Sequence, residues 1–388
     1  MRYSSDIIDV VPVRNKGLGV ISKRDIEISE IIVIDSPFLS TPTHDTDSSP
    51  LNMCIGCNQP ISFRSSEDAV DEASDTRNNH FHNFFPKRTM TCAYNCGESY
   101  CSEECHISFS PSHKYLCTVA TPSVALLRAH NMWRSSSRFR LFCLAAARVV
   151  AAYEQSVSLG NTIVEVIESY SHTVVMNGTQ PANDSITHEF IRLSTDAVIL
   201  LRRCLDVNGT LSNVDSMFDD HIISKIDSFV STTGYMKFWC ICASNAHGIL
   251  HPSLLQLAFT EAVIQQKEIC VLQNLLDTAP DGAASGAASG ATCSALFPVL
   301  CRFNHSCNPN ATIRVLLLNE KRQVPHSKLS AESKSNEMLL VASIALRPIK
   351  AGEEVCISYI DKGSESDTCH DLMERYGFQC DCVACCGR

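Results

Sequence analysis

Four closely spaced pairs of cysteine or histidine residues restrict the fold of this chain more than any other feature. A short pair lets one turn supply two ligands to a tetrahedral zinc ion, and two pairs complete a site. Four consecutive pairs therefore predict two zinc ions in one small module. If the pairs alternate, one set is Cys54, Cys57, Cys101 and Cys105, and the other is Cys92, Cys96, His113 and Cys117.

The cysteine content supports metal binding rather than disulfides. The 388 residues include 21 cysteines, an odd number that excludes complete pairing within the chain. Clustered cysteines in a reducing compartment indicate metal sites. Alternative ligands near the module are His80, His82 and His106, and the spacing favours His113. Unconnected buried thiols are the other interpretation, which the regular pairing disfavours.

Composition and charge narrow the class of protein. No stretch approaches the ~18 uninterrupted apolar residues of a membrane span, and the N-terminus lacks the apolar core of a signal peptide. We therefore expect a location in the nucleus or the cytoplasm, without membrane association. The net charge of −10 argues against a general nucleic-acid binder and suits a basic protein or peptide substrate.

Hydrophobic periodicity predicts helices followed by strands. Apolar residues recur at intervals of three and four over residues 123–130, 138–154, 187–206, 217–230 and 252–276. Runs rich in β-branched residues predict strands within 20–39 and over 311–318, 338–346 and 354–360. Three polar or low-complexity segments interrupt this pattern: a disordered insert at 58–91, a flexible linker at 279–291 and an exposed extension at 319–337.

Residues 302–310 place asparagine, histidine and cysteine together in a loop between two apolar runs. Loops of this kind carry binding groups on a rigid scaffold, although an Asn-rich turn is the simpler interpretation. Near the C-terminus, Cys380, Cys382 and Cys385 offer three thiolates at zinc-binding spacing. The fourth ligand could be the adjacent Cys386 or the distant Cys307.

The order of these motifs resembles the SET and MYND domain-containing protein-lysine methyltransferases. The shared features are a Gly-x-Gly turn, the paired-cysteine module, Asn-His-Ser-Cys-x-Pro-Asn, Gly-Glu-Glu-x-x-Ile-Ser-Tyr and the final C-x-C-x2-C, from Lys16 to Cys386. The resemblance implies an α+β fold of small SET-type β-sheets around a threaded knot, an exception among protein topologies. It also implies an inserted zinc-binding MYND module, a helical insert and a zinc-bound post-SET tail.

The resemblance divides the chain into five parts. Residues 1–49 correspond to the N-terminal part of the SET domain, 50–117 to the MYND-type module, 118–230 to the helical insert, 231–361 to the catalytic SET core, and 362–388 to the post-SET tail. Since the chain ends directly after this tail, without the C-terminal helical repeat domain of longer members, we expect an open substrate cleft.

Site residues follow from the same resemblance. Tyr359 corresponds to the catalytic tyrosine, and S-adenosylmethionine is expected to contact Lys16, Gly17, Gly19, Asn245, Asn304, His305, Tyr359 and Phe378. A third zinc ion is expected on Cys307, Cys380, Cys382 and Cys385, and the eight paired ligands match the interleaved MYND arrangement. Methyl transfer needs a neutral amine held in line with the S–CH₃ bond, so correct positioning of the amine accounts for much of the rate enhancement.

The resemblance implies a monomeric, S-adenosylmethionine-dependent protein-lysine N-methyltransferase that acts on a histone or another protein and holds three structural zinc ions. No direct sequence-specific contact with nucleic acid is expected. The alternative is a weak or inactive SET/MYND adaptor whose MYND module binds proline-rich peptides. Three departures from the family pattern favour that alternative: Leu18 replaces a polar or basic residue, Ser29 a glycine, and His247 an aromatic channel residue.

Overall fold

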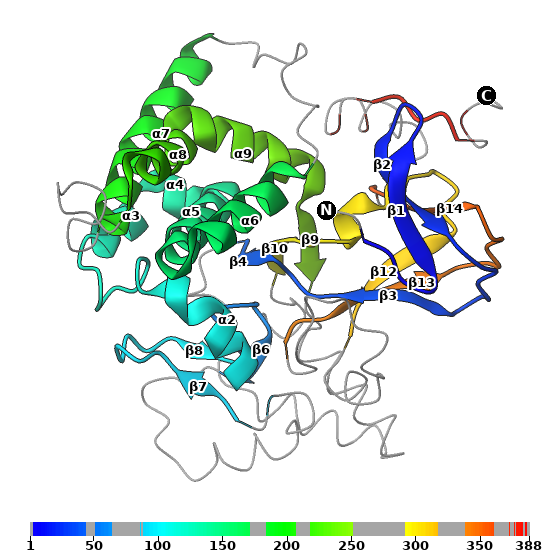
Figure 1. Cartoon of the computed structure of the whole chain (residues 1–388), viewed down its shortest axis with the longest axis horizontal. Helices are drawn as coiled ribbons and strands as arrows, with labels where there is room; N and C mark the ends of the chain where they lie inside the picture. Colours follow the sequence, from blue (N-terminus) through cyan, green and yellow to red (C-terminus); the bar gives the residue numbers. More distant parts are fainter. Residues whose placement is uncertain are drawn as a thin grey trace, which may run out of the picture.

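Most helices of this protein lie on one side of the molecule, and the strands β1, β2, β3, β12, β13 and β14 lie on the other (Figure 1). The computed structural model describes residues 3–43, 51–63, 86, 88–170, 184–206, 218–250, 292–316, 338–360, 372, 376, 378–382 and 385. Within these ranges the fold is α+β with small sheets, as predicted. None of the described helices combines the length and the apolar run that crossing a membrane would require. The predicted helix at 252–276, the linker at 279–291 and the extension at 319–337 lie outside these ranges.

The largest sheet brings together strands from opposite ends of the chain. Its order is β1 (Ile8–Val13), β2 (Gly17–Ser22), β14 (Glu354–Ile357) and β11 (Asn304–His305). β14 pairs antiparallel with β2 and parallel with β11. The last strand therefore lies between the N-terminal hairpin and the Asn-His segment, which sets three predicted site motifs side by side.

Two three-stranded sheets complete this part of the fold. One has the order β4 (Leu39–Pro42), β10 (Thr292–Leu296) and β9 (His247–Leu250), and the other β12 (Ala311–Val315), β13 (Val341–Ala345) and β3 (Ile31–Asp35). All pairings within these two sheets are antiparallel. β3 is buried along nearly its whole length, as expected for a continuous β-branched run. The strand predictions are confirmed for β3, β12 and β13, whereas β4, β9 and β10 were not predicted.

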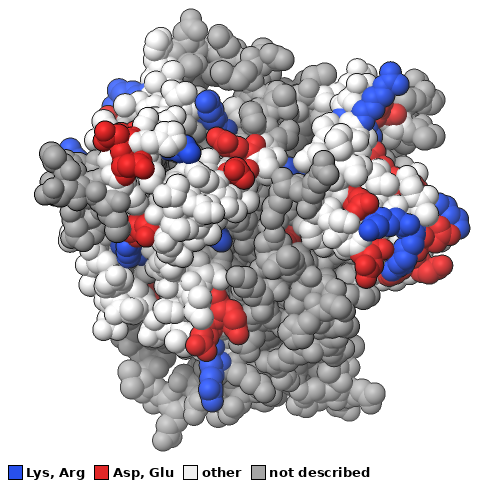
Figure 2. All heavy atoms as spheres, in the orientation of Figure 1, with Lys and Arg blue, Asp and Glu red and all other residues white. Residues whose placement is uncertain are grey.

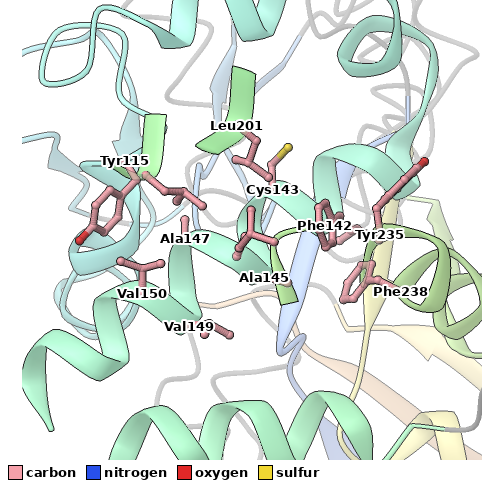
Figure 3. Close-up of a cluster of buried hydrophobic side chains, with 14 of the residues drawn as sticks. Tyr115, Phe142, Cys143, Ala145, Ala147, Val149, Val150, Leu201, Tyr235 and Phe238 are labelled. Carbon is pink, nitrogen blue, oxygen red and sulfur yellow. The ribbon is translucent and has the colours of Figure 1, made fainter. Parts of the chain in front are cut away.

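A helical cluster forms the other part of the molecule. It consists of α3 (Val124–Ala129), α4 (Asn131–Ser135), α5 (Ser137–Gln155), α6 (Val157–Glu168), α7 (Asp184–Leu205), α8 (Asp220–Phe229) and α9 (Thr232–Asn245). α5 is its centre: the hydroxyl of Ser136 caps its first turn, and alanines on several faces let other helices approach. Figure 3 shows the side chains of α5 packed among aromatic rings, with the Phe142 and Tyr235 centroids 5.2 Å apart.

The helix predictions were confirmed for α3, α5, α7 and α8, but α4, α6 and α9 of this cluster were missed. α6 contains Gly160 and several β-branched residues, which have low helix propensity. It is helical because Ser156 caps it and because Gly160 lets it lie directly against the Tyr153 ring. α9 was missed because apolar residues such as Met236 and Trp239 also lie outside its buried face, so the sequence shows no clear helical period.

The paired-cysteine module is built from two hairpins and one helix. β5 (Leu51–Met53) pairs with β6 (Pro60–Phe63), β7 (Met90–Thr91) pairs with β8 (Ser99–Tyr100), and α2 (Glu103–His113) follows. The prediction of a disordered insert over 58–91 was wrong at both ends, where β6 and β7 are ordered by pairing with strands next to the cysteine turns. Residues 64–85 lie outside the described part of the chain.

Candidate active site and metal clusters

The Asn-His loop is entered through a short 3₁₀ turn, η3 (Leu300–Arg302), that is fixed from two sides. The buried carboxylate of Asp35, at the end of β3, accepts the backbone N–H groups of Val299 and Leu300 at 2.8 and 3.1 Å. The buried guanidinium of Arg302 donates to the Ser169 carbonyl at 2.7 Å and lies 4.9 Å from the Tyr170 ring. The end of α6 and the end of β3 therefore both position the loop.

β11 then places Asn304 and His305 beside β14, so that His305 lies opposite Ile357. Asn310 closes the loop over the same strand: its Oδ1 accepts the Cys356 N–H at 2.8 Å, and its Nδ2 donates to the Glu354 carbonyl at 2.8 Å. Tyr359 follows two residues after β14 ends. Pairing of the two strands thus brings the histidine and the tyrosine together across 54 positions of sequence.

Both ring nitrogens of His305 are engaged. Nδ1 accepts the Tyr359 backbone N–H at 3.0 Å, which leaves the proton on Nε2, 3.2 Å from Cys307 Sγ. Burial, reinforced by the charge of Lys16, lowers the pKa of His305 to about 4, so the ring is neutral near pH 7. The imidazole therefore links the backbone of Tyr359 to Cys307, a predicted zinc ligand. A cofactor can then contact the face of the His305 ring or the His305 backbone.

Tyr359 lies in a cluster of aromatic rings. Its hydroxyl donates to the Phe303 carbonyl at 2.7 Å, and burial raises its pKa, so the phenol stays protonated at neutral pH. The ring centroids of Tyr376, His305 and Phe378 lie 4.9, 5.4 and 6.3 Å away. The C-terminal tail thereby contributes two of the rings around the predicted catalytic tyrosine.

Lys16, Gly19 and Asn304 meet around the carboxylate of Glu354, and Gly17 follows Lys16 in the chain. Gly17 has a φ of +76°, which favours glycine at this turn. A Cβ at Gly19 would lie 2.7 Å from Asn304 Nδ2, so only glycine lets β2 approach this closely. Partial burial lowers the pKa of Lys16, but the hydrogen bond to Glu354 and the charges of Glu354 and Asp381 together raise it, so the ammonium group stays charged.

These residues fit the cofactor that the resemblance implies. A cation and an amide suit the amino-acid end of S-adenosylmethionine, and the neighbouring rings suit its flat, apolar adenosyl end. Asn245 is connected less directly. Its amide donates to the Ile241 carbonyl of its own helix at 2.8 Å, while its backbone carbonyl accepts the Cys301 thiol of η3 at 2.9 Å. The structure thus places Asn245 beside the loop, with its amide nitrogen turned onto α9.

The predicted ligands gather into three clusters. In each, the four ligand atoms lie within 4.8 Å of one another: Cys54, Cys57, Cys101 and Cys105; Cys92, Cys96, His113 and Cys117; and Cys307, Cys380, Cys382 and Cys385. A tetrahedral zinc ion with bonds of about 2.3 Å holds two sulfurs about 3.8 Å apart. The shortest contacts between ligand atoms are slightly below this distance, at 3.4 Å for Cys54 and Cys105, 3.3 Å for Cys96 Sγ and His113 Nε2, and 3.4 Å for Cys307 and Cys385. All three clusters could therefore hold a metal ion.

Three site residues were not predicted from the sequence. Glu354 lies within the quoted Gly-Glu-Glu motif, but its contact with Lys16 depends on the pairing of β14 with β2. Tyr376 precedes the predicted Phe378 by two positions, and an aromatic pair at that spacing was an available signal. Arg302 adjoins the Asn-His motif, and its partner at the end of α6 could not be inferred without that helix.

Comparison with known proteins agrees with this geometry. The SET domain family matches residues 17–360. The protein-lysine N-trimethyltransferase SMYD5 of Danio rerio is 23% identical over 405 residues, which cover 98% of this chain and 88% of the relative. SMYD5 of Homo sapiens is 25% identical over 307 residues, covering 75% of this chain and 64% of the human protein.

A shorter similarity concerns the histone-lysine N-methyltransferase SMYD3 of Mus musculus. It is 34% identical over 91 residues, which are 23% of this chain and 16% of the mouse protein. The SET match covers most of the chain, and the relatives combine with the three cysteine clusters to support the subfamily. This chain therefore belongs to the SET domain family and, within it, to the SET and MYND domain-containing protein-lysine methyltransferases.

Proposed function

We propose that this protein transfers methyl groups from S-adenosylmethionine to a lysine side chain of a protein substrate, with Tyr359 orienting the amine. The observation that carries the proposal is the hydrogen bond of the Tyr359 hydroxyl to the Phe303 carbonyl, at 2.7 Å. S-adenosylmethionine, when bound, supplies an electrophilic methyl group on a sulfonium centre. The residues of the chain then have to hold a neutral amine in line with that group.

The direction of the Tyr359 hydroxyl decides what it can do. Because its proton is directed to Phe303, the lone pairs of the phenol oxygen are available to accept an N–H from the lysine amine. Burial raises the pKa of Tyr359, so it remains a phenol and does not act as a phenolate base. Its role is therefore to direct the lone pair of the amine toward the methyl group.

The rings of His305, Tyr376 and Phe378 lie beside the Tyr359 ring and are proposed to limit the access of water to its hydroxyl. A site poor in water disfavours the ammonium form of lysine and favours the neutral nucleophile. Lys16, Asn304 and the two glycines are proposed to hold the amino-acid end of the cofactor, and Phe378 its adenosyl end.

Three zinc ions are proposed for the three clusters, each in a closed structural site without an open ligand position. Cys307, a ligand of the third cluster, is joined to the catalytic region through His305. We also propose the five-part division of the chain given above and a location in the nucleus or the cytoplasm.

The identity of the protein substrate is a separate proposal. The relatives include a histone-lysine methyltransferase and protein-lysine N-trimethyltransferases, so histones and trimethyl-lysine are the first substrate and product to assay. The surface does not narrow this choice: acidic and basic side chains are interspersed on the face drawn in Figure 2.

The adaptor alternative is not favoured, since the SET match and the named methyltransferase relatives support an enzyme. A radiolabelled-cofactor assay on histones and cell lysate tests the proposal, with Tyr359→Phe as the comparison. We expect label transfer by the wild-type protein, loss of transfer by the variant, and unchanged cofactor affinity in calorimetry. If wild-type protein loaded with zinc binds no cofactor, or if the variant transfers label normally, the proposal is wrong.

A further inference from the structure

Glu354 connects the two polar residues of the predicted cofactor site. Its Oε2 lies 3.1 Å from Lys16 Nζ, and its Oε1 accepts Asn304 Nδ2 at 2.8 Å. The side chains of Glu354 and Lys16 are only 20% and 29% exposed. A carboxylate and an ammonium group are thus held side by side, largely away from water, where the amino-acid end of the cofactor is expected.

The orientation of Asn304 adds a second acceptor at this place. Its Nδ2 contacts the Leu18 carbonyl at 3.2 Å as well as Glu354, and both partners are acceptors, so the nitrogen must face them. Oδ1 is therefore directed elsewhere, and no residue in the described ranges donates a hydrogen bond to it. Glu354 and Asn304 together present carboxylate and amide oxygens to a cationic group.

The backbone of β2 holds this pair in position. A Cβ at Gly19 would lie 2.7 Å from Asn304 Nδ2 and 3.0 Å from Glu354 Oε1. Only the absence of a side chain lets the strand lie against both groups. The paired groups therefore occupy a confined site, where their charges are screened less than on an open surface.

We propose that Glu354 binds the α-ammonium group of S-adenosylmethionine while Lys16 binds its α-carboxylate. The inference rests on the proposed function and adds one residue to the cofactor site. An amino acid carries both charges on one carbon, so it can insert between the two side chains and exchange one ion pair for two. Each of the two half-buried charges keeps an opposite charge when the cofactor binds.

A different role for Glu354, that of neutralising Lys16 only, predicts the opposite effect of its replacement on cofactor affinity. If Glu354 only neutralised Lys16, the cofactor carboxylate would have to displace it and leave a half-buried carboxylate without a cation, which is unfavourable. Replacing Glu354 with glutamine would then strengthen cofactor binding. If Glu354 holds the ammonium group, the same replacement must weaken binding.

Calorimetric titration of wild-type protein and Glu354→Gln distinguishes the two roles. The probes are S-adenosylmethionine, S-adenosylhomocysteine and 5′-methylthioadenosine, the last of which lacks the amino-acid end. We expect the variant to bind the first two about 10-fold more weakly, as for the loss of a hydrogen bond to a charged group, and the third unchanged. An equal loss for the first two shows that the contact is with the ammonium group rather than the sulfonium.

The matched control is Glu30→Gln. Glu30 is also a partly buried glutamate, 22% exposed, in an ion pair with Arg24 at 2.6 Å, but it lies away from the cofactor residues. This variant should keep wild-type affinity for all three probes. Tighter or unchanged binding of S-adenosylmethionine by Glu354→Gln would overturn the inference, as would a weakening shared with 5′-methylthioadenosine.

A measurement on wild-type protein keeps the inference testable if Glu354→Gln does not fold. S-adenosylhomocysteine should bind about 10-fold more tightly than its analogue without the α-amino group, and equal affinities would overturn the inference. Failure of the proposed function gives a different result, because zinc-loaded wild-type protein would then bind none of the adenosyl compounds.

Discussion

Replacing Cys307 with serine should release the C-terminal tail and weaken cofactor binding together. Cys307 Sγ lies 3.4 Å from Cys385 Sγ and 3.2 Å from His305 Nε2. A serine hydroxyl is a poor zinc ligand and a weaker acceptor than a thiolate. The change therefore removes one of four ligands from the tail cluster and the partner of the His305 N–H in the same step.

The size of the effect follows from two contacts. Phe378 is carried by the tail, with its ring centroid 6.1 Å from that of His305. Its contact with a neighbouring ring or the cofactor is worth about 1 kcal/mol, and a hydrogen bond to a charged sulfur about 1.5 kcal/mol. If both losses reach the cofactor, the sum of about 2.5 kcal/mol corresponds to an affinity roughly 70-fold weaker. Partial transmission would still give a loss of about 5-fold or more.

Elemental analysis and calorimetry measure the two consequences on the same preparation. We expect the zinc content to fall from three ions per chain to two and the dissociation constant for S-adenosylmethionine to rise. Cys240→Ser is the control, since Cys240 is a buried thiol in α9 outside the three clusters. A Cys307→Ser protein with two zinc ions and wild-type cofactor affinity would show that the tail and the loop act independently.

Two further changes test the scaffold by urea unfolding. Ser29 has a φ of +65°, so Ser29→Gly should relieve about 1–2 kcal/mol of strain, offset by about 0.5–1 kcal/mol from the greater freedom of glycine when unfolded. A free energy of unfolding no higher than that of the wild type would show that Ser29 is not strained. The Arg148 guanidinium lies 4.4 and 5.2 Å from the Phe38 and Phe109 rings and donates to the Phe38 carbonyl. Arg148→Met should therefore lower the free energy of unfolding by about 2 kcal/mol. An unchanged unfolding energy would show that these contacts contribute nothing.

The metal clusters could be predicted from the sequence because their ligands come in short pairs. A turn such as the one from Cys54 to Cys57 fixes two ligands locally, and only the choice of partner pair depends on the fold. The strands around the Asn-His loop were predicted for a similar reason, since the β-branched runs are local signals. The resemblance supplied the identity of Tyr359, which no local pattern marks as catalytic.

The contacts that position the site could not be predicted in this way. Lys16 pairs with Glu354, which lies 338 positions away in the sequence. Arg302 contacts Ser169, which lies 133 positions away. Such contacts depend on which strands and helices are neighbours, and sequence patterns do not encode that order. The fourth ligand of the tail cluster is another example, because the sequence alone did not decide between Cys386 and Cys307. In the structure Cys307 joins the cluster, since β11 pairs with β14.

The first MYND-type cluster is part of the same apolar core as the SET strands. Cys54, Cys57, Cys101 and Cys105 pack in one buried cluster with residues such as Phe303 and Val355. The Leu339 N–H, just before β13, donates to Cys57 Sγ at 3.3 Å, and Ser40 of β4 accepts the Asn58 amide at 3.0 Å. Because a metal-bound thiolate is a stronger acceptor than a thiol, zinc at this cluster would strengthen the contact with the strand region directly. The module is therefore better understood as a metal-dependent part of the SET core than as a separate appendage.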